Sequence, residues 1–94
     1  MQVIFDPAKN RRNAIEHAGV TFEEAKDVLT DLRALVREDD DAIGEQRFVS
    51  LGQGAKGRIL VVVWTLRDND EKIRLISAWK ANAQQRKRYE NQPV

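Results

Sequence analysis

The sequence contains no cysteine, two prolines and a single histidine among its 94 residues. Without cysteine the chain forms neither a disulfide nor a thiolate metal site. One imidazole, that of His17, excludes a metal cluster built on several histidines and is far from a catalytic triad. No apolar run approaches the roughly 20 residues of a membrane span, and residues 1–6 do not resemble a signal peptide. We therefore expect one domain over residues 1–94, in a reducing cytoplasm.

The net charge of +1 conceals opposite charges in the two halves of the chain. Residues 1–45 carry 6 Lys/Arg against 11 Asp/Glu, and residues 46–94 carry 10 against 4. A fold that gathers the second half on one face presents a basic surface, which attracts phosphate. The simpler alternative is that mixed surface charge only keeps a small domain in solution.

The first half of the sequence predicts one short strand and two helices. Residues 3–5 are apolar and favour a strand. Asp6 and Pro7 are typical of a helix start, and Gly19 is typical of the end of a helix that reaches Ala18.

The second helix begins at a capping box formed by Thr21 and Glu24. Apolar residues follow at helical spacing, so one side of this helix is predicted to be buried. These apolar residues are Phe22, Ala25, Val28, Leu29 and Leu32.

The second half predicts consecutive strands and a closing helix. Residues 59–64 are continuously apolar and β-branched, which is typical of a strand buried on both faces. Asn82 and Gln85 are typical of a capped helix that ends near Tyr89. The tight turns favour an α+β fold in which two N-terminal helices and one C-terminal helix pack on an antiparallel sheet. The other predicted strands cover residues 35–36, 47–51 and 72–77.

Three features of the sequence could indicate a catalytic histidine, a metal site or a nucleotide-binding loop, but none has the further residues that such a site needs. His17 lies just before the predicted helix end, where an imidazolium interacts well with the helix dipole, and general acid–base work is the alternative role. Acids on the adjacent positions 38–41 rarely converge on one ion, so they predict a solvated loop. The glycine-rich turn 52–57 does not lead into a helix, which argues against a nucleotide-binding loop.

Basic and aromatic residues dominate the sheet hairpins and the closing helix. Cationic side chains neutralise phosphates and aromatic rings stack on unpaired bases, so this mixture suits single-stranded RNA. A metal-free ribonuclease works with similar groups, which move protons and stabilise charge on the scissile phosphate. The alternative is structural, with Trp64 in the core and the arginines on a solvated face. The candidate RNA-binding residues are Arg67, Trp79, Lys80, Arg86, Lys87 and Arg88.

Three segments of the chain, in this order and spacing, resemble the BrnT family of toxins over nearly the whole sequence. The segments are Phe5–Lys9 with Asn13 and His17–Ala25, then Gly44–Phe48 with Gly57–Val63, and last Ile73–Ala78 with Lys80–Asn82 and Arg86–Glu90.

The resemblance implies the toxin of a type II toxin–antitoxin module, with a RelE-like fold and RNA cleavage that needs no metal or other cofactor. It also implies a BrnA-type antitoxin that neutralises the toxin and binds the operator DNA. We expect this antitoxin to cover at least part of the basic face, which includes Arg58, Arg74 and residues 80–89. By position, the resemblance assigns the catalytic set Lys9, His17, Arg58, Arg74 and Tyr89.

Four positions depart from the family pattern. Leu66 stands where an acid is usual and Trp79 where an arginine is usual, while Gln84 and Gln85 replace a common Arg and Glu. Two candidates for proton transfer and phosphate binding are thereby lost. The sequence supports two hypotheses of different class, which are a working endoribonuclease and a binding-only member. Because side chains on a strand repeat every two residues, we expect Trp79 to share a face with Ile73, Leu75 and Ser77.

Overall fold

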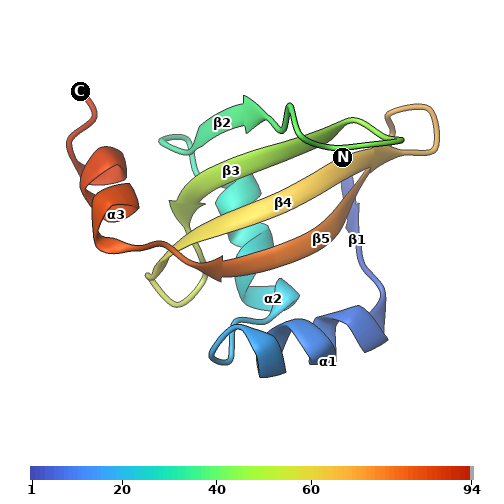
Figure 1. Ribbon diagram of the computed structural model, residues 1–94, viewed down its shortest axis with the longest axis horizontal. Coiled ribbons are helices and arrows are strands. Elements are labelled where there is room, and N and C mark those ends of the chain that lie inside the picture. Colours follow the sequence, from blue (N-terminus) through green and yellow to red (C-terminus); the bar gives the residue numbers. More distant parts are fainter. Residues whose placement is uncertain (94) are drawn as a thin grey trace.

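The computed structural model describes residues 1–93 and has an α+β fold with one five-stranded sheet (Figure 1). The strand order across the sheet is β1-β5-β4-β3-β2. Within the described residues, no helix is long and apolar enough to cross a membrane. The elements are β1 (Gln2–Ile4), α1 (Pro7–Glu16), α2 (Phe22–Ala25), the 3-10 helix η1 (Lys26–Thr30), β2 (Leu35–Glu38), β3 (Arg47–Gln53), β4 (Ile59–Arg67), β5 (Lys72–Lys80) and α3 (Ala83–Glu90).

The sheet is mixed, so the prediction of a wholly antiparallel sheet is wrong at one edge. Strands β2 to β5 pair antiparallel, as their short connections require. Strand β1 instead pairs parallel with β5, with Val3 opposite Ile73. No hairpin joins these two strands, so no turn dictates their relative direction.

Helix α1 starts as predicted, because the Asp6 carboxylate accepts a hydrogen bond from the Ala8 N–H. It ends at Glu16, two residues early, since the backbone turns left-handed at Ala18 (φ 53°) and Gly19 (φ 81°).

The second predicted helix exists only in part. The Thr21 hydroxyl caps α2, but the α-helix stops at Ala25 and η1 replaces the remaining turns. Asp31 then adopts an extended conformation, and its carboxylate accepts the Gln53 N–H at 2.9 Å, which ties the end of η1 to β3. Leu32 follows this break and is 101% exposed, so its predicted burial is wrong. The N-terminal half thus has one full helix and one short helical segment.

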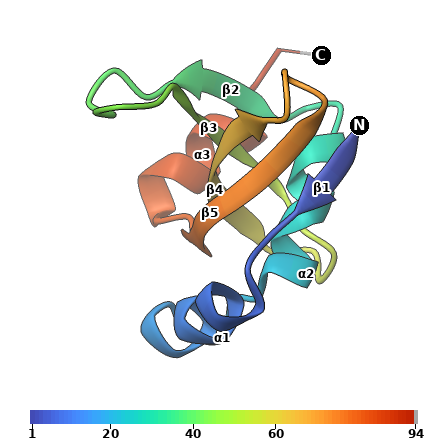
Figure 2. The ribbon, with the colours of Figure 1, turned by 90° about the vertical axis from the view of Figure 1, so that its right-hand side faces the viewer.

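Helices cover the two faces of the sheet unequally. In Figure 2, α2 and η1 lie against one face and α3 lies against the opposite face. The predicted central strand is confirmed, since β4 is third of five and its side chains enter both cores. Leu60 and Val62 pack on the α2 side with Phe22, and Val61 packs on the α3 side with Tyr89.

Asn13 of α1 closes the edge of β5 beyond the end of β1. Its Nδ2 donates to the carbonyls of Ala78 (2.8 Å) and Val20 (2.9 Å), and its Oδ1 accepts the Ala78 N–H at 3.1 Å. The side chain is buried, and its amide supplies the two bonds that a neighbouring strand would make. This contact fixes the C-terminal end of α1 beside the end of β5.

A bulge at Ile76 changes which residues of β5 share a face. Leu75 pairs with Trp64 and Ser77 pairs with Val63, so Ile76 has no partner on β4. Leu75 therefore packs in the core on the α2 side, whereas Trp79 packs on the α3 side. The expectation that Trp79 shares a face with Leu75 is wrong, because unbroken alternation does not survive the extra residue.

Candidate functional site: a groove beside the C-terminal helix

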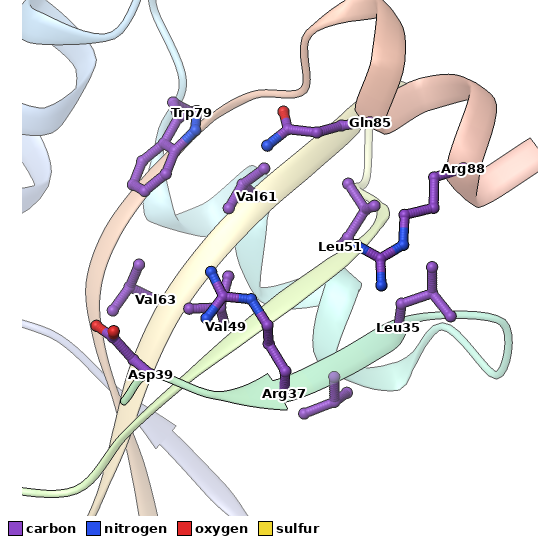
Figure 3. Close-up of a pocket in the computed structure, with 11 residues that line it drawn as sticks. Leu35, Arg37, Asp39, Val49, Leu51, Val61, Val63, Trp79, Gln85 and Arg88 are labelled. Carbon is purple, nitrogen blue, oxygen red and sulfur yellow. The ribbon is translucent and has the colours of Figure 1, made fainter. Parts of the chain in front are cut away.

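The α3-facing side of the sheet carries a groove of about 380 Å³ between the strands and α3, here called the α3 groove. Its floor is aliphatic, and its rim is polar except for one indole ring. Figure 3 shows these side chains converging from β2, β3, β4, β5 and α3. The floor residues are Leu35, Val49, Leu51, Val61 and Val63, the rim residues are Arg37, Asp39, Trp79, Gln85 and Arg88, and Val36 lines the groove at the β2 edge.

Strand register explains why these residues meet. Leu35, Leu51, Val61 and Trp79 form one cross-strand row, because each pairs with the next across the sheet. The adjacent row on the same face runs from Arg37 through Val49 and Val63 to Ser77. Side chains two residues apart on a strand share a face, so the two rows together build the floor.

The charged groups of the groove are mostly cationic. The Arg37 and Arg88 guanidiniums point over the floor in Figure 3, and neither makes an ion pair within residues 1–93. Asp39, at the end of β2, supplies a carboxylate on the rim. Arg74 belongs to the next row on this face, opposite Thr65, and it also has no ion-pair partner in the described chain. The groove therefore presents uncompensated positive charge above an apolar surface.

Trp79 links the groove to α1. Its ring lies 5.8 Å from the His17 ring, centroid to centroid, with the planes inclined by 39°. His17 caps the C-terminus of α1, which the Asn13 contact holds at this edge. The structure thus brings a predicted catalytic residue and a predicted RNA-binding residue into contact. Trp64, by contrast, packs in the core on the α2 side and donates to the Ser50 hydroxyl at 2.9 Å.

Tyr89 anchors α3 over the sheet. Its side chain is buried, and its hydroxyl donates to the Asp31 carboxylate. Burial and this hydrogen bond raise the pKa of Tyr89. Burial also pushes the pKa of Asp31 upward, but bonds from Tyr89 and from the N–H groups of Gln53 and Arg33 outweigh it, so the pKa of Asp31 is lowered. The phenol is therefore engaged in holding α3, and this fixes the wall that carries Gln85 and Arg88.

Arg58 lies on the α2 side of the sheet, away from the α3 groove. Its guanidinium makes two hydrogen bonds to the Glu24 carboxylate, with Nε donating to Oε2 at 2.7 Å. The Glu24 side chain is 1% exposed and that of Arg58 is 31% exposed. The hydrogen bonds from Arg58 lower the pKa of Glu24, and those to Glu24 raise the pKa of Arg58. This predicted catalytic residue is committed to a buried ion pair.

The remaining predicted site residues are dispersed. Lys9 is exposed on α1, while Arg67 pairs with Glu45 at 3.0 Å in the rim of the sheet. Arg86 donates to the Ala81 carbonyl at 2.9 Å. Lys80 and Lys87 are exposed at the end of β5 and on α3. None of these five lines the α3 groove.

Sequence reasoning missed Arg37 and Asp39. Both lie in or beside a segment that the sequence marks as acidic, and residues 38–41 were expected to be a solvated loop. The available signal was the pair Leu35 and Arg37, which alternate onto one face once residues 35–38 form a strand. Only the pairing of β2 with β3 shows that this face borders the groove.

The sequence model of the ribonuclease toxins BrnT, of type II toxin–antitoxin systems, matches residues 5–85. The chain belongs to this family. The fold is similar to that in the 1.1 Å crystal structure of the Brucella abortus ribonuclease toxin BrnT, with a TM-score of 0.64 and 18% identity over 87% of this chain and 97% of that one. At that identity the likeness concerns the fold. No curated protein gives a match.

Membership of the BrnT family settles two expectations and leaves others open. As a ribonuclease toxin of a type II system, the chain has an antitoxin as its partner. The α+β fold resembling BrnT is confirmed. The matched segment stops within α3, so residues 86–90, including Arg88 and Tyr89, lie beyond it. The roles of the individual site residues remain predictions.

Proposed function

We propose that this BrnT-family toxin cleaves single-stranded RNA in the cytoplasm without a metal ion. We further propose that a BrnA-type antitoxin neutralises it and carries the contact with operator DNA. The family match over residues 5–85 carries the proposal. The α3 groove supports it, because unpaired guanidiniums beside an indole suit phosphate and an unpaired base.

The proposed reaction is attack of a ribose 2′-hydroxyl on the adjacent phosphate. A base takes the 2′ proton, the bond from phosphorus to the 5′ oxygen breaks, and that oxygen receives a proton. Guanidiniums stabilise the charge that develops on phosphorus-bound oxygens. Arg37, Arg74 and Arg88 are the cations available on this face, and His17 and Asp39 are the candidate proton carriers. Of the predicted catalytic set, Arg58 and Tyr89 are instead engaged with Glu24 and Asp31.

We propose that cleavage is weak. Trp79 occupies the rim of the groove at a position where the family resemblance leads us to expect an arginine. An indole stacks on a base but cannot neutralise a phosphorane, and loss of one such donor in a well-studied enzyme costs on the order of 10²–10³ in rate. The second candidate function, a binding-only member that engages antitoxin or RNA, is favoured by this substitution and by Leu66.

Trp79→Arg tests both functions in one assay. We expect this variant to cleave RNA faster than the native chain, with both rates unchanged by EDTA. Leu32→Arg is the matched control, because it adds an arginine at a side chain that is 101% exposed and does not line the groove. Antitoxin affinity should stay within about tenfold in both variants.

If the native chain and the Trp79→Arg variant both cleave RNA, and at the same rate, Trp79 is a structural residue. If neither protein cleaves RNA while both bind antitoxin, the binding-only function holds.

A further inference from the structure

The floor of the α3 groove is built for apolar side chains. Val49, Val63 and Leu35 are only half-buried there, although Val49 and Leu35 pack against the core formed by Leu51 and Val61. Aliphatic groups gain free energy when apolar groups cover them, but they offer a nucleobase no aromatic face. The aromatic ring that the groove offers to a base is the Trp79 indole, which lies on the rim beside His17 and not on the floor.

The two arginines on the rim of the groove favour a negatively charged occupant. Arg37 on β2 and Arg88 on α3 flank the floor from two sides, and neither has an ion-pair partner within residues 1–93. Guanidiniums bind carboxylates in bidentate geometry. An occupant that places acidic side chains beside these two arginines and apolar side chains on the floor complements both features.

The groove is open along one side. Strand β2 is the edge of the sheet, with no further strand beside it in the part of the chain that the structure describes. Val36 on that strand is 58% exposed, and Leu35 continues the floor up to the edge. A polypeptide segment can therefore enter across β2 without displacing α3.

We propose that the α3 groove is the docking site for an acidic, apolar segment of the antitoxin. This inference rests on the proposed function, and it adds a mechanism of neutralisation. A segment seated on Val63 and paired with Arg37 and Arg88 covers the guanidiniums that RNA phosphates require. Antitoxin and RNA then compete for the same two arginines, while the aliphatic floor serves the antitoxin alone.

The test compares two ligands on the same set of full-length variants. The ligands are the purified BrnA-type antitoxin of the same operon and a short 2′-O-methyl RNA, which cannot be cleaved. Val63→Asn removes apolar contact at a half-buried position and leaves the charge unchanged. Arg37→Glu and Arg88→Glu reverse the rim charges. Leu32→Asn and Lys26→Glu are the matched controls, since both residues are exposed and outside the groove.

We expect each groove variant to weaken antitoxin binding at least about tenfold, as loss of a central contact does. Val63→Asn should leave the RNA affinity within about twofold of that of the native chain. The two control variants should bind the antitoxin and the RNA as tightly as the native chain does. Circular dichroism and thermal unfolding would verify that each variant is folded. If Val63→Asn does not fold, Arg88→Glu still tests the inference, because Arg88 is exposed.

Three other results would overturn the inference. If the native chain binds the antitoxin and the groove variants bind it equally well, the docking site is elsewhere and the proposed function stands. If Val63→Asn weakens RNA but not antitoxin, the floor is an RNA subsite. If the native chain binds no BrnA-type antitoxin, that part of the proposed function fails together with the inference.

Discussion

At the scale of single residues, Arg58 shows how a basic side chain can be assigned a role that its surroundings do not favour. The sequence presents it as one cation among many on the hairpins and closing helix. Its contact with Glu24 joins residues 34 positions apart, and no local pattern reveals it. Folding places both on the α2 side, where a buried carboxylate requires a charged partner.

Arg58→Met should destabilise the protein by about 2–3 kcal/mol at neutral pH. Removing one partner of a buried pair costs roughly 3–5 kcal/mol, and the partial exposure of Arg58 places the cost below that range. Urea unfolding would measure it, with Arg11→Met on exposed α1 as the control. A change equal to that of the control would show that the pair contributes nothing to stability.

The cost of Arg58→Met to stability should depend on pH and become smaller in acid. The folded state lowers the pKa of Glu24 below its ordinary value of 4.5. The contribution of the ion pair is therefore present above that pH and is lost as the pH falls through the lower, folded-state pKa. The stability difference between native protein and Arg58→Met should shrink over this acidic window.

At the scale of elements, the sequence predicts which strands and helices exist better than it predicts which face of the sheet their side chains occupy. Strand β4 follows from its apolar run, and α3 from the capping box that Asn82 and Gln85 do form. The bulge at Ile76 leaves no comparable signal, since an extra residue in a strand looks like ordinary sequence. It nevertheless moves Trp79 to the opposite face from Leu75. The location of the candidate site therefore depended on register, which alternation alone could not supply.

Helix α3 is held to the sheet chiefly by one aromatic residue. Tyr89→Phe keeps the ring but removes the hydrogen bond to Asp31, which leaves a partly buried carboxylate with one donor fewer. We expect a loss of about 1.5–3 kcal/mol, the range for hydrogen bonds to charged groups. A double-mutant cycle with Asp31→Asn would isolate the pair energy, and additive effects would contradict this coupling.

The hydrogen bond between Tyr89 and Asp31 should also lose its contribution to stability at both high and low pH. The pKa of Tyr89 is raised, so its contribution is complete below the ordinary value of 10.0 and is lost as the pH rises through the folded-state pKa. The pKa of Asp31 is lowered, so its contribution is lost as the pH falls through that lower value. Thermal unfolding of Tyr89→Phe should show no tyrosine-linked loss on the alkaline side.

At the scale of the whole molecule, the charged halves of the sequence do not become two charged faces. Arg37 comes from the acidic half and joins the α3 groove, whereas Arg58 comes from the basic half and lies on the α2 side. Composition could predict that a basic surface exists. It could not predict which cations remain free, because carboxylates elsewhere in the chain neutralise some of them, as Glu45 does for Arg47 and Arg67.

Salt dependence of RNA binding distinguishes free cations from neutralised ones. Each phosphate contact with single-stranded nucleic acid contributes about 0.7 to the slope of log K against log salt concentration. Arg37→Gln and Arg88→Gln should each reduce the slope by about that amount, because neither guanidinium has an ion-pair partner within residues 1–93. Arg58→Gln should leave the slope unchanged, since Glu24 already neutralises this arginine. Fluorescence anisotropy with the 2′-O-methyl RNA at several salt concentrations would measure all three. An equal reduction for Arg58→Gln would place RNA on the α2 side and reject the α3 groove as its binding surface.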